Sequence, residues 1–400
     1  MEKIYFKELF DVSSGLSKGA KELANGDNPF LTFKTIFNNT FLPDEIVDKA
    51  NTNESEQEKY SVRKGDIFLT RTSETMDELG MSSVALKDYP GAVFNGFSKR
   101  LRLKNNISIS IDLKYLGYFL RSRLFRDQVD AMSNTSTRAS LNIEMINRLY
   151  LLLPDISTQK RIGSTLYLLE EKIKNNNETN QNLEEQLLGY YRELFVINLD
   201  PSWKTATVSD LGKVVGGSTP SKKNDEYYTS DGIAWITPKD LSNDHSKFIA
   251  HGENDITELG LANSSAVCMP KGTVLFSSRA PIGYIAIADG VVTTNQGFKS
   301  VVPFDEIGTA FVYCFLKENL NVIENMASGS TFKEISGSTM KTVPAFIPDT
   351  NTMTKFRTFA DTILEKQKNN EAENKRLATI RDVLLPKLMT GEIDLSDVKL

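Results

Sequence analysis

Residues 172–187 read KIKNNNETNQNLEEQL, and residues 366–381 read KQKNNEAENKRLATIR. The second stretch repeats the lysines, several asparagines and one leucine of the first at a constant offset of 366 − 172 = 194 residues. Reading outward from each copy, a seam recurs at alternating steps of four and three residues, mostly apolar, which is the a/d pattern of a coiled coil. The repeat predicts two long helices of the same kind, half a chain apart.

The repeated asparagines stand on this seam, as Asn176 and Asn180 in the first copy and Asn370 and Asn374 in the second. Asparagine weakens a coiled coil but fixes its register and partner. We therefore expect the four amides to form one polar layer between the two helices. The alternative is that they face solvent on two unrelated helices.

The predicted helices cover residues 159–195 and 355–385, and Pro386 is expected to end the second one. The first helix carries the chain into a second globular segment, and the second helix leaves that segment. Both seams can be buried only if the second helix runs back along the first. The pair should therefore be antiparallel.

The segments outside the helices also repeat. VRKGDIFLTR (62–71) matches CMPKGTVLFSSR (268–279), and SNTSTRASLNIEMINRLYLLLP (133–154) matches SGSTFKEISGSTMKTVPAFIP (328–348). Short β-rich runs separated by Gly, Asn, Asp and Pro dominate both copies. This pattern predicts an α+β fold with two pseudo-twofold-related domains, each a curved β-sheet with short helices, separated by the antiparallel two-helix coiled coil.

The expected boundaries follow from these matches. They are 1–154 for the first globular domain, 155–197 for the central helix, 198–348 for the second domain and 349–400 for the second helix and tail. One short helix is expected in each domain, over residues 113–132 and 307–326.

Composition sets limits on the class of protein. The 400 residues carry a net charge of −5 and two cysteines, which rules out a disulfide framework and suits the cytoplasm. The start of the chain lacks an apolar core, so no signal peptide is expected, and no run is long enough to span a membrane. The mild acidity argues against a lone nucleic-acid binder.

Three stretches of the sequence partly match known enzyme or metal-binding motifs. DNPF (27–30) has one proline and no glycine-rich loop before it, so it reads as a turn and not as a methyltransferase element. GKVVGGST (212–219) has Ser218 where a phosphate-binding loop needs lysine. His245, His251 and Cys268 fit no common zinc spacing. No catalytic residue, metal or cofactor is therefore predicted in this chain.

The order of these stretches resembles the specificity subunit of type I restriction-modification systems. The resemblance is strongest over VSDLGKVVGGSTPSKK, GIAWITPKDLS and ASGSTFKEISGSTMKTVPAFIP, and LLPKLMTGEIDL (384–395) resembles the family's ending. The first domain diverges, with LTF (31–33) where the second has ITP. The resemblance covers essentially the whole chain.

The resemblance implies a subunit without catalytic activity. Each domain would be a target-recognition domain that reads one half of a bipartite double-stranded DNA target. The helices would set the gap between the halves and hold two modification subunits. Those partners would use S-adenosylmethionine to methylate adenine, and restriction subunits would join them; no membrane is implied.

DNA readout needs polar side chains on loops, together with Lys or Arg for phosphates. Any one candidate could instead be a solvated turn or a cap. The candidates in the first domain are Arg71, Thr72, Ser73, Ser98, Arg100, Arg102, Lys104, Ser136, Thr137 and Arg138. Those in the second are Ser218, Thr219, Lys222, Lys223, Lys239, Ser278, Arg279, Asn295, Gln296, Lys299, Ser330, Thr331 and Lys333.

Other interpretations remain open at this stage. Arg121, Arg123 and Arg126 could contact phosphates or simply be solvated. Asn95-Gly96-Phe97 aligns with Gln296-Gly297-Phe298, which favours a turn or core role for the glycine and phenylalanine. A fused methyltransferase would need a catalytic domain for which the chain has no room. A scaffold without nucleic acid would explain the helices but not the repeated basic loops.

Overall fold

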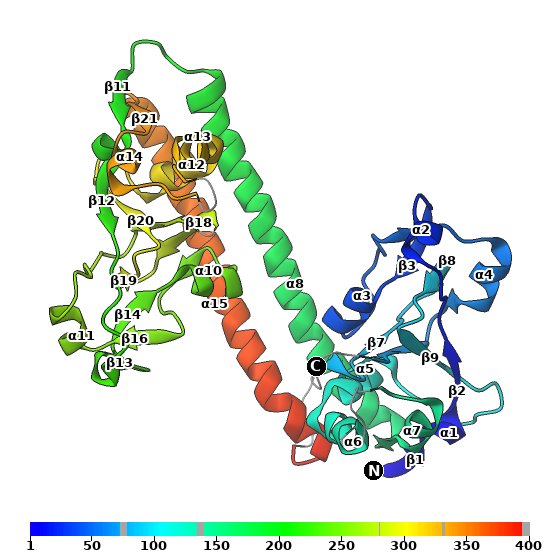
Figure 1. Ribbon diagram of the computed structural model, residues 1–400. Helices are drawn as coiled ribbons and strands as arrows, with labels where there is room; N and C mark the ends of the chain where they lie inside the picture. The colour runs from blue at the N-terminus through cyan, green and yellow to red at the C-terminus, as the bar shows by residue number, and fades with distance from the viewer. Residues whose placement is uncertain (73–77, 134–139, 280, 330–332, 394–400) are drawn as a thin grey trace. The chain divides into compact units, whose positions relative to one another are not determined.

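The computed structural model describes residues 1–72, 78–133, 140–279, 281–329 and 333–393 (Figure 1). The chain forms two compact units: unit 1 is Met1–Ile173 with Arg376–Leu400, and unit 2 is Lys174–Lys375. Each unit combines sheets with short helices, so the predicted α+β class is confirmed. Both long helices contribute one piece to each unit.

Unit 1 contains three sheets and seven short helices among its described residues. The sheet orders are β1-β10, β2-β9-β6-β7 and β4-β3-β8-β5. The strands are β1 (Glu2–Tyr5), β2 (Phe10–Ser14), β3 (Asn28–Leu31), β4 (Lys49–Ala50), β5 (Ser61–Val62), β6 (Ile67–Thr70), β7 (Ser82–Val84), β8 (Tyr89–Phe94), β9 (Ser98–Leu103) and β10 (Tyr150–Leu153). The short helices are α1 (Phe6–Leu9), α2 (Ala20–Leu23), α3 (Phe33–Asn38), α4 (Glu54–Lys59), α5 (Leu113–Arg121), α6 (Arg123–Ser133) and α7 (Ile143–Arg148).

Unit 2 is built on the same plan. The sheet orders are β11-β21, β12-β20-β17-β18-β15 and β13-β16-β14-β19. The strands are β11 (Lys204–Thr207), β12 (Gly212–Gly216), β13 (Tyr228–Thr229), β14 (Ile233–Ile236), β15 (Phe248–Ile249), β16 (Asn254–Ile256), β17 (Val274–Ser278), β18 (Ile282–Ala288), β19 (Val292–Thr294), β20 (Lys299–Pro303) and β21 (Pro344–Ile347). The helices are α9 (Val208–Leu211), the 3₁₀ turn η3 (Asp225–Tyr227), α10 (Pro238–Asn243), α11 (Glu258–Ala262), α12 (Thr309–Glu318), α13 (Leu320–Met326) and α14 (Gly337–Lys341).

Equivalent strand pairs show that the two units share a fold. Each globular part begins and ends in an antiparallel two-stranded ribbon, β1-β10 in unit 1 and β11-β21 in unit 2. Each also has a parallel pair at the equivalent place, β3 with β8 and β14 with β19. The repeat in the sequence is therefore a repeat of structure.

Both predicted short helices are broken in two. In unit 1 the side chain of Asp112 caps α5 by accepting a hydrogen bond from Tyr115 N (2.9 Å). Ser122 adopts an extended conformation and ends α5, so α6 starts anew at Arg123. In unit 2 Asn319 separates α12 from α13. The spacing of apolar residues predicts one helix in each domain, but local backbone conformation divides each of them into two.

The long helices are α8 (Ile156–Arg192), continued by the π-helical turn η2 (Glu193–Ile197), and α15 (Thr350–Thr390). The predicted end of the second helix before Pro386 is wrong, because α15 continues for one more turn. Leu388 and Met389 in that turn are fully buried in the core of unit 1. The favourable free energy of burying these two side chains offsets the loss of the backbone hydrogen bond that Pro386 cannot donate. Gly391, with φ of +75°, then ends the helix.

The core of each unit lies between its long-helix segments and its sheets. In unit 1, Ile162 and Leu166 of α8 pack with Phe119 and Phe125 of the broken helix pair. In unit 2, Phe195 contacts Phe311 and Phe356, with ring centroids 5.1 Å apart in both pairs. The long helices are therefore part of each core, and they hold the sheets in place.

Candidate functional site

Four segments that are distant in sequence meet at one end of the β12–β20–β17 sheet in unit 2. Ser218 N donates to the carbonyl of Thr294 (2.9 Å), and Ser278 N donates to the carbonyl of Gly297 (2.7 Å). A Cβ on Gly217 would lie 2.0 Å from the carbonyl oxygen of Asn295, so only glycine fits there. We call residues 216–223, 278–279, 295–299 and 333–334 the unit 2 loop cluster.

Several predicted DNA-contact residues of this cluster bond to one another. Thr219 Oγ1 is hydrogen-bonded to Gln296 Oε1. Lys299 Nζ lies 3.3 Å from the carbonyl of Gln296 and 3.7 Å from Glu334. Arg279 also pairs with Glu334, at 3.6 Å. The polar side chains are thus held in one hydrogen-bonded group.

Other candidates in unit 2 differ in how far they are committed to internal partners. Lys222, Lys223 and Lys333 are exposed and make no ion pair within the part of the chain that the structure describes. Lys239 is exposed but lies 2.8 Å from Glu253. Ser278 is fully buried and donates its hydroxyl proton to the carbonyl of Gly297 (3.0 Å). The three free lysines are the side chains most available to phosphates.

Unit 1 assembles an equivalent set of segments, residues 14–18, 71–72, 95–99 and 140–141, which we call the unit 1 loop cluster. Leu16 N donates to the carbonyl of Phe94 (2.8 Å), and Arg71 N donates to the carbonyl of Phe97 (2.9 Å). A Cβ on Gly15 would lie 2.0 Å from the carbonyl oxygen of Asn95. These contacts repeat those of Ser218, Ser278 and Gly217 one by one.

The turns after β8 and β19 correct the residue correspondence expected from the sequence. Asn95 Oδ1 accepts from Phe97 N (2.8 Å), and Asn295 Oδ1 accepts from Gly297 N (2.8 Å). Asn95 is therefore equivalent to Asn295, and Phe97 to Gly297. This correspondence is shifted by one residue from the sequence alignment, which paired Phe97 with Phe298. As a result Phe298 is fully buried whereas Phe97 is 66% exposed, so Phe97 lies in a turn, as one of the two expected roles had it, and is not a core residue.

Two arginines on the predicted DNA-reading strand face, β9, are committed to internal partners. Arg102 makes two hydrogen bonds to the buried carboxylate of Asp66, at 2.7 and 2.6 Å. Arg100 is 8% exposed and donates to the carbonyl of Ser61 (2.6 Å), and burial lowers its pKa. Through these bonds both arginines join β9 to the segment 61–66 of the same unit. They are therefore not part of the proposed DNA-contact set. Ser98 on the same strand is buried and bonded to Asn95.

The remaining basic candidates of unit 1 also divide into internal and exposed side chains. Arg121 donates to the carbonyls of Ser82, Ile36, Phe37 and Asn39. Arg126 bonds to the carbonyl of Leu79 (2.6 Å). Lys104 reaches the carbonyl of Lys7. Of the three helix arginines, Arg123 alone has a largely exposed side chain (83%). Ser73, Ser136, Thr137, Arg138, Ser330 and Thr331 lie outside the described residues.

In unit 2, α8 and α15 run antiparallel and their asparagines form a layer. Asn176 Nδ2 donates to Asn374 Oδ1 (2.9 Å), and Asn370 Nδ2 donates to Asn180 Oδ1 (2.8 Å). Gln367 Nε2 adds a bond to the carbonyl of Asn180 (2.9 Å). Asn176 and Asn370 are about 95% buried, at 5% and 4% exposure. The layer thus joins two buried amides to two partly exposed ones.

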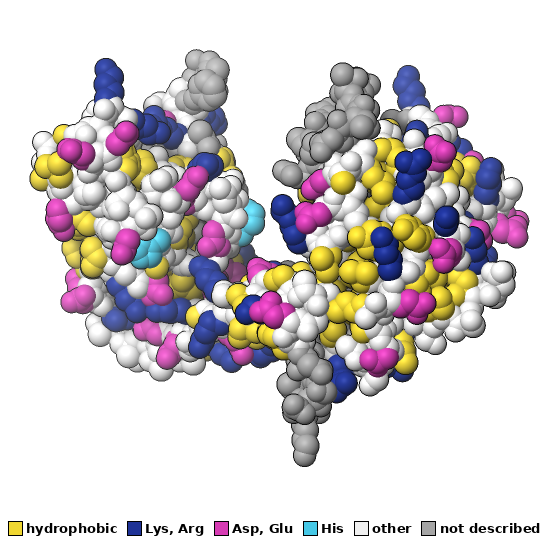
Figure 2. Space-filling view, turned by 90° about the horizontal axis from the view of Figure 1, so that it is seen from below, with side chains coloured by type: hydrophobic (Ala, Val, Ile, Leu, Met, Phe, Trp, Pro, Cys, Tyr) yellow, Lys and Arg dark blue, Asp and Glu magenta, His cyan; other side chains and the backbone are white. Residues whose placement is uncertain are grey.

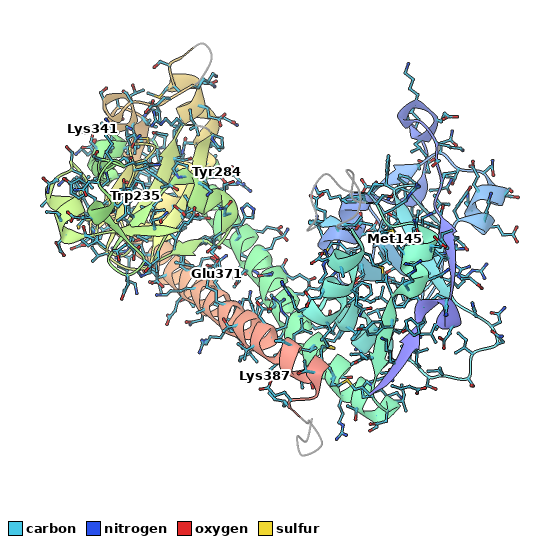
Figure 3. The ribbon with its side chains drawn as sticks, turned by 60° about the horizontal axis from the view of Figure 1, so that its bottom comes forward. Met145, Trp235, Tyr284, Lys341, Glu371 and Lys387 are labelled. Carbon is cyan, nitrogen blue, oxygen red and sulfur yellow. The ribbon has the colours of Figure 1, made fainter. Side chains whose placement is uncertain are left out.

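A partly buried ionic group ties the unit 2 sheet to the same helices. Lys247, next to β15, pairs with Glu184 of α8 and donates to Gln367 of α15 (2.6 Å). Glu371 of α15, labelled in Figure 3, accepts from the backbone N–H groups of Lys247 (2.9 Å) and Phe248 (3.1 Å). Burial raises the pKa of Glu184, but Lys247 and Lys317 outweigh it and lower that pKa to about 2. The sheet, both helices and their charges form one connected group.

Figure 2 shows basic and acidic side chains interspersed on the visible face of both units, in keeping with the net charge of −5. No group of three or more His, Cys, Asp or Glu side chains that could hold a metal ion occurs among the described residues. Within the same residues, no helix combines the length and apolar character that crossing a membrane requires.

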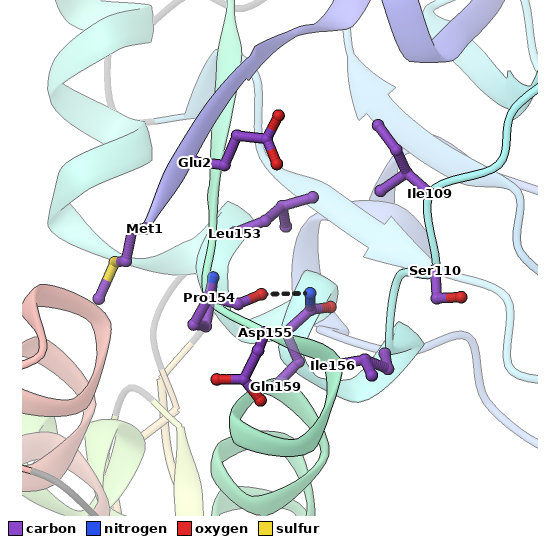
Figure 4. A pocket seen from close by; sticks show the side chains of 9 residues that line it. All are labelled: Met1, Glu2, Ile109, Ser110, Leu153, Pro154, Asp155, Ile156 and Gln159. Atoms are coloured by element: carbon purple, nitrogen blue, oxygen red, sulfur yellow. Dashed lines mark hydrogen bonds between the residues drawn. The ribbon is translucent and has the colours of Figure 1, made fainter.

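A pocket of about 440 Å³ in unit 1 lies beside the start of α8 (Figure 4). Two of the polar side chains that line it have other partners: Gln159 donates to the carbonyl of Pro154 (2.8 Å) and accepts from Asp112 N (3.0 Å). Asp155 caps α8 through Thr158. These groups are committed to the start of α8, so the pocket offers no assembled ligand site.

Comparisons with a family model and with known proteins point to the same family. The family model described as "Type I restriction modification DNA specificity domain" matches residues 1–185 and 201–374. The chain is 41% identical over 187 residues to the type I restriction enzyme MjaIX specificity subunit of Methanocaldococcus jannaschii, covering 45% of this chain and 43% of that relative. It is 25% identical to the HindI specificity subunit of Haemophilus influenzae, over 96% of this chain and 98% of the relative.

The fold is also similar to that of the type I restriction-modification S subunit from M. genitalium. The TM-score is 0.61 at 16% identity, over 97% of this chain and 95% of that one. At this identity the similarity concerns the fold alone.

Proposed function

Because the chain belongs to the type I restriction modification DNA specificity family, with two copies of its domain, we propose that it gives such a system its DNA sequence specificity. Each unit would read one half of a bipartite double-stranded target. The observation that carries this proposal is the pair of equivalent loop clusters, built by the same backbone contacts but bearing different side chains.

The backbone of the two clusters is shared, so it cannot distinguish their targets. The side chains differ at equivalent places: the cluster of unit 1 carries Arg71 and the exposed Phe97, whereas that of unit 2 carries Ser278 and Gly297, which are both buried. Base identity is read by side chains at base edges, whereas phosphate contacts position the protein. Two loop clusters with the same backbone and different side chains are suited to reading two different half-sites.

The proposed set of DNA-contact residues is narrower than the sequence suggested. It consists of Arg71, Thr72, Ser218, Thr219, Lys222, Lys223, Lys239, Arg279, Asn295, Gln296, Lys299 and Lys333. Arg100, Arg102 and Ser278 are excluded because their polar groups are committed within the protein.

The proposal assigns no chemistry to this chain. Methyl transfer to adenine would belong to two modification subunits that bind S-adenosylmethionine, and cleavage to restriction subunits. The paired helices α8 and α15 would hold the modification subunits and fix the gap between the half-sites. The free cysteines, Cys268 and Cys314, suit the reducing cytoplasm.

Selection from a random DNA library by the full chain, bound to its modification subunit, tests the proposal. The expected result is two short specified blocks around an unspecified spacer. Exchanging residues 1–154 for the first domain of another family member should change one block and leave the other intact. A single contiguous target, no sequence preference, or methyl transfer by the purified chain alone would overturn the proposal.

A further inference from the structure

Phe97 is the most exposed aromatic side chain among the described residues, at 66%. Its backbone is nevertheless held firmly, by the bond from its N–H to Asn95 Oδ1 (2.8 Å) and the bond from Arg71 N to its carbonyl (2.9 Å). Asn95 itself is 5% exposed and donates to the carbonyl of Leu31 (2.9 Å). The ring is therefore presented to solvent from a fixed turn.

Polar and basic groups surround this turn in the unit 1 loop cluster. Lys99 Nζ donates to Ser14 Oγ (2.6 Å). Burial lowers the pKa of Lys99, and the nearby positive charge of Arg71 lowers it further. The turn also packs against Ser17, since a Cβ on Gly96 would lie 2.4 Å from Ser17 Oγ. Two basic residues thus belong to the cluster that holds this turn, Arg71 through its backbone bond to Phe97 and Lys99 two residues further along the chain, and basic residues suit a surface that approaches DNA phosphates.

Unit 2 has no counterpart of this ring. The equivalent residue is Gly297, where a Cβ would lie 2.9 Å from Asn295 Oδ1 and 3.0 Å from Pro238 Cγ. Pro238 and the turn itself thus leave no room for a side chain. Whatever Phe97 contacts should therefore be specific to the half-site of unit 1.

Resting on the proposed function, we propose that Phe97 determines specificity by contacting the 5-methyl group of a thymine in the half-site read by unit 1. A phenyl ring neither donates nor accepts a conventional hydrogen bond, so it cannot read the polar edges of the bases. The thymine methyl is the apolar group that the major groove displays, and phenylalanine is one of the side chains that contacts it. The fixed turn lets one ring select one position.

Library selection with the Phe97→Ala variant, in complex with the modification subunit, tests this inference. One thymine in the first block should lose its preference, and affinity for the wild-type target should fall about five- to tenfold. Replacing that thymine by deoxyuridine, which lacks the methyl group, should weaken wild-type binding by a similar factor. It should not weaken the variant further, because both changes remove the same contact.

Val47→Ala is the matched control, because Val47 is an apolar residue of unit 1 that is 80% exposed outside the cluster. It should leave both blocks unchanged. Unchanged thermal unfolding of Phe97→Ala will show that the fold is intact. Unaltered blocks, a uniform loss of affinity for all sequences, or no effect of deoxyuridine would each overturn the inference. In this experiment the proposed function itself fails if the wild-type complex selects no bipartite target, an outcome distinct from those above.

Discussion

Asn176 of α8 donates a hydrogen bond from Nδ2 to Oδ1 of Asn374 on α15, at 2.9 Å, from a position that is 5% exposed. A buried amide satisfied across a helix pair fixes the register, because sliding one helix leaves the amide without a partner. Asn370 and Asn180 repeat the arrangement one turn away, at 2.8 Å.

Replacing Asn370 alone by leucine should lower the free energy of unfolding by about 1–3 kcal/mol, because Oδ1 of Asn180 loses its hydrogen-bond donor. Replacing all four asparagines by leucine should instead raise thermal stability and permit other registers or self-association. Urea unfolding and light scattering measure both effects. Asn175→Leu, on the exposed face of α8, is the control. A less stable, strictly monomeric quadruple variant would contradict this role of the layer.

Glu184→Gln should remove part of the acid sensitivity of unit 2. The lysines beside Glu184 lower its folded-state pKa to about 2, so its contribution to stability is present above pH 4.5 and is lost as the pH falls toward 2. The contribution is on the order of 2–3 kcal/mol. Urea midpoints between about pH 3 and pH 6, which include the upper part of the range in which this carboxyl group loses its advantage, should therefore vary less in the variant. Equal pH dependence in Glu184→Gln and the exposed control Glu185→Gln would show that this ionic group is unimportant.

Arg102→Ala should affect folding and not recognition. It leaves the carboxylate of Asp66, which is 1% exposed, without its bidentate partner. The expected loss is about 2–4 kcal/mol of unfolding free energy. The folded fraction should still select the wild-type DNA blocks. Arg123→Ala, which removes an exposed pair with Asp127, should cost less than about 0.5 kcal/mol.

Lys222→Ala with Lys223→Ala should weaken DNA binding to a similar extent for all sequences. Each lysine that contacts a phosphate contributes about one to the slope of log affinity against log salt, so the slope should fall by about two. Fluorescence anisotropy between about 50 and 200 mM salt measures it. Lys341→Ala, an exposed lysine labelled in Figure 3 at the end of α14, should leave the slope unchanged. A change in the selected bases would instead assign these lysines to base reading.

Deleting one heptad from α8 and one from α15 together should shorten the unspecified spacer by about three base pairs. Seven helical residues span about 10 Å, and ten base pairs about 34 Å. Library selection with the shortened chain should return both blocks unchanged at the closer spacing. An unchanged spacer would mean that the helices do not set the gap.

Repeats in the sequence predicted the α+β class and the two long helices, because heptad spacing and turn residues depend on residues that are close together in the sequence. The end of α15 was mispredicted because the burial of Leu388 and Met389 outweighs the effect of Pro386. The break at Ser122 depends on local capping, which the spacing of apolar residues does not encode.

The candidate site was predictable to a smaller extent. The repeated loops did lead to segments that lie together in each unit. The internal role of Arg102, however, depends on Asp66, a partner 36 residues away that a pattern of basic residues does not identify. Phe97 was missed because matching letters placed it opposite the buried Phe298, whereas hydrogen bonds place it opposite Gly297.

The two-stranded ribbons have a consequence for how such proteins change over generations. Glu2 pairs with Leu153 and Lys204 with Ile347, so each globular part enters and leaves through neighbouring strands. A recombination event that replaces everything between the two strands of one ribbon needs matching sequence only at those two junctions. The other unit and its half of the target would be inherited unaltered. Under the proposed function, one such replacement would change the DNA specificity of one unit and preserve the rest of the gene.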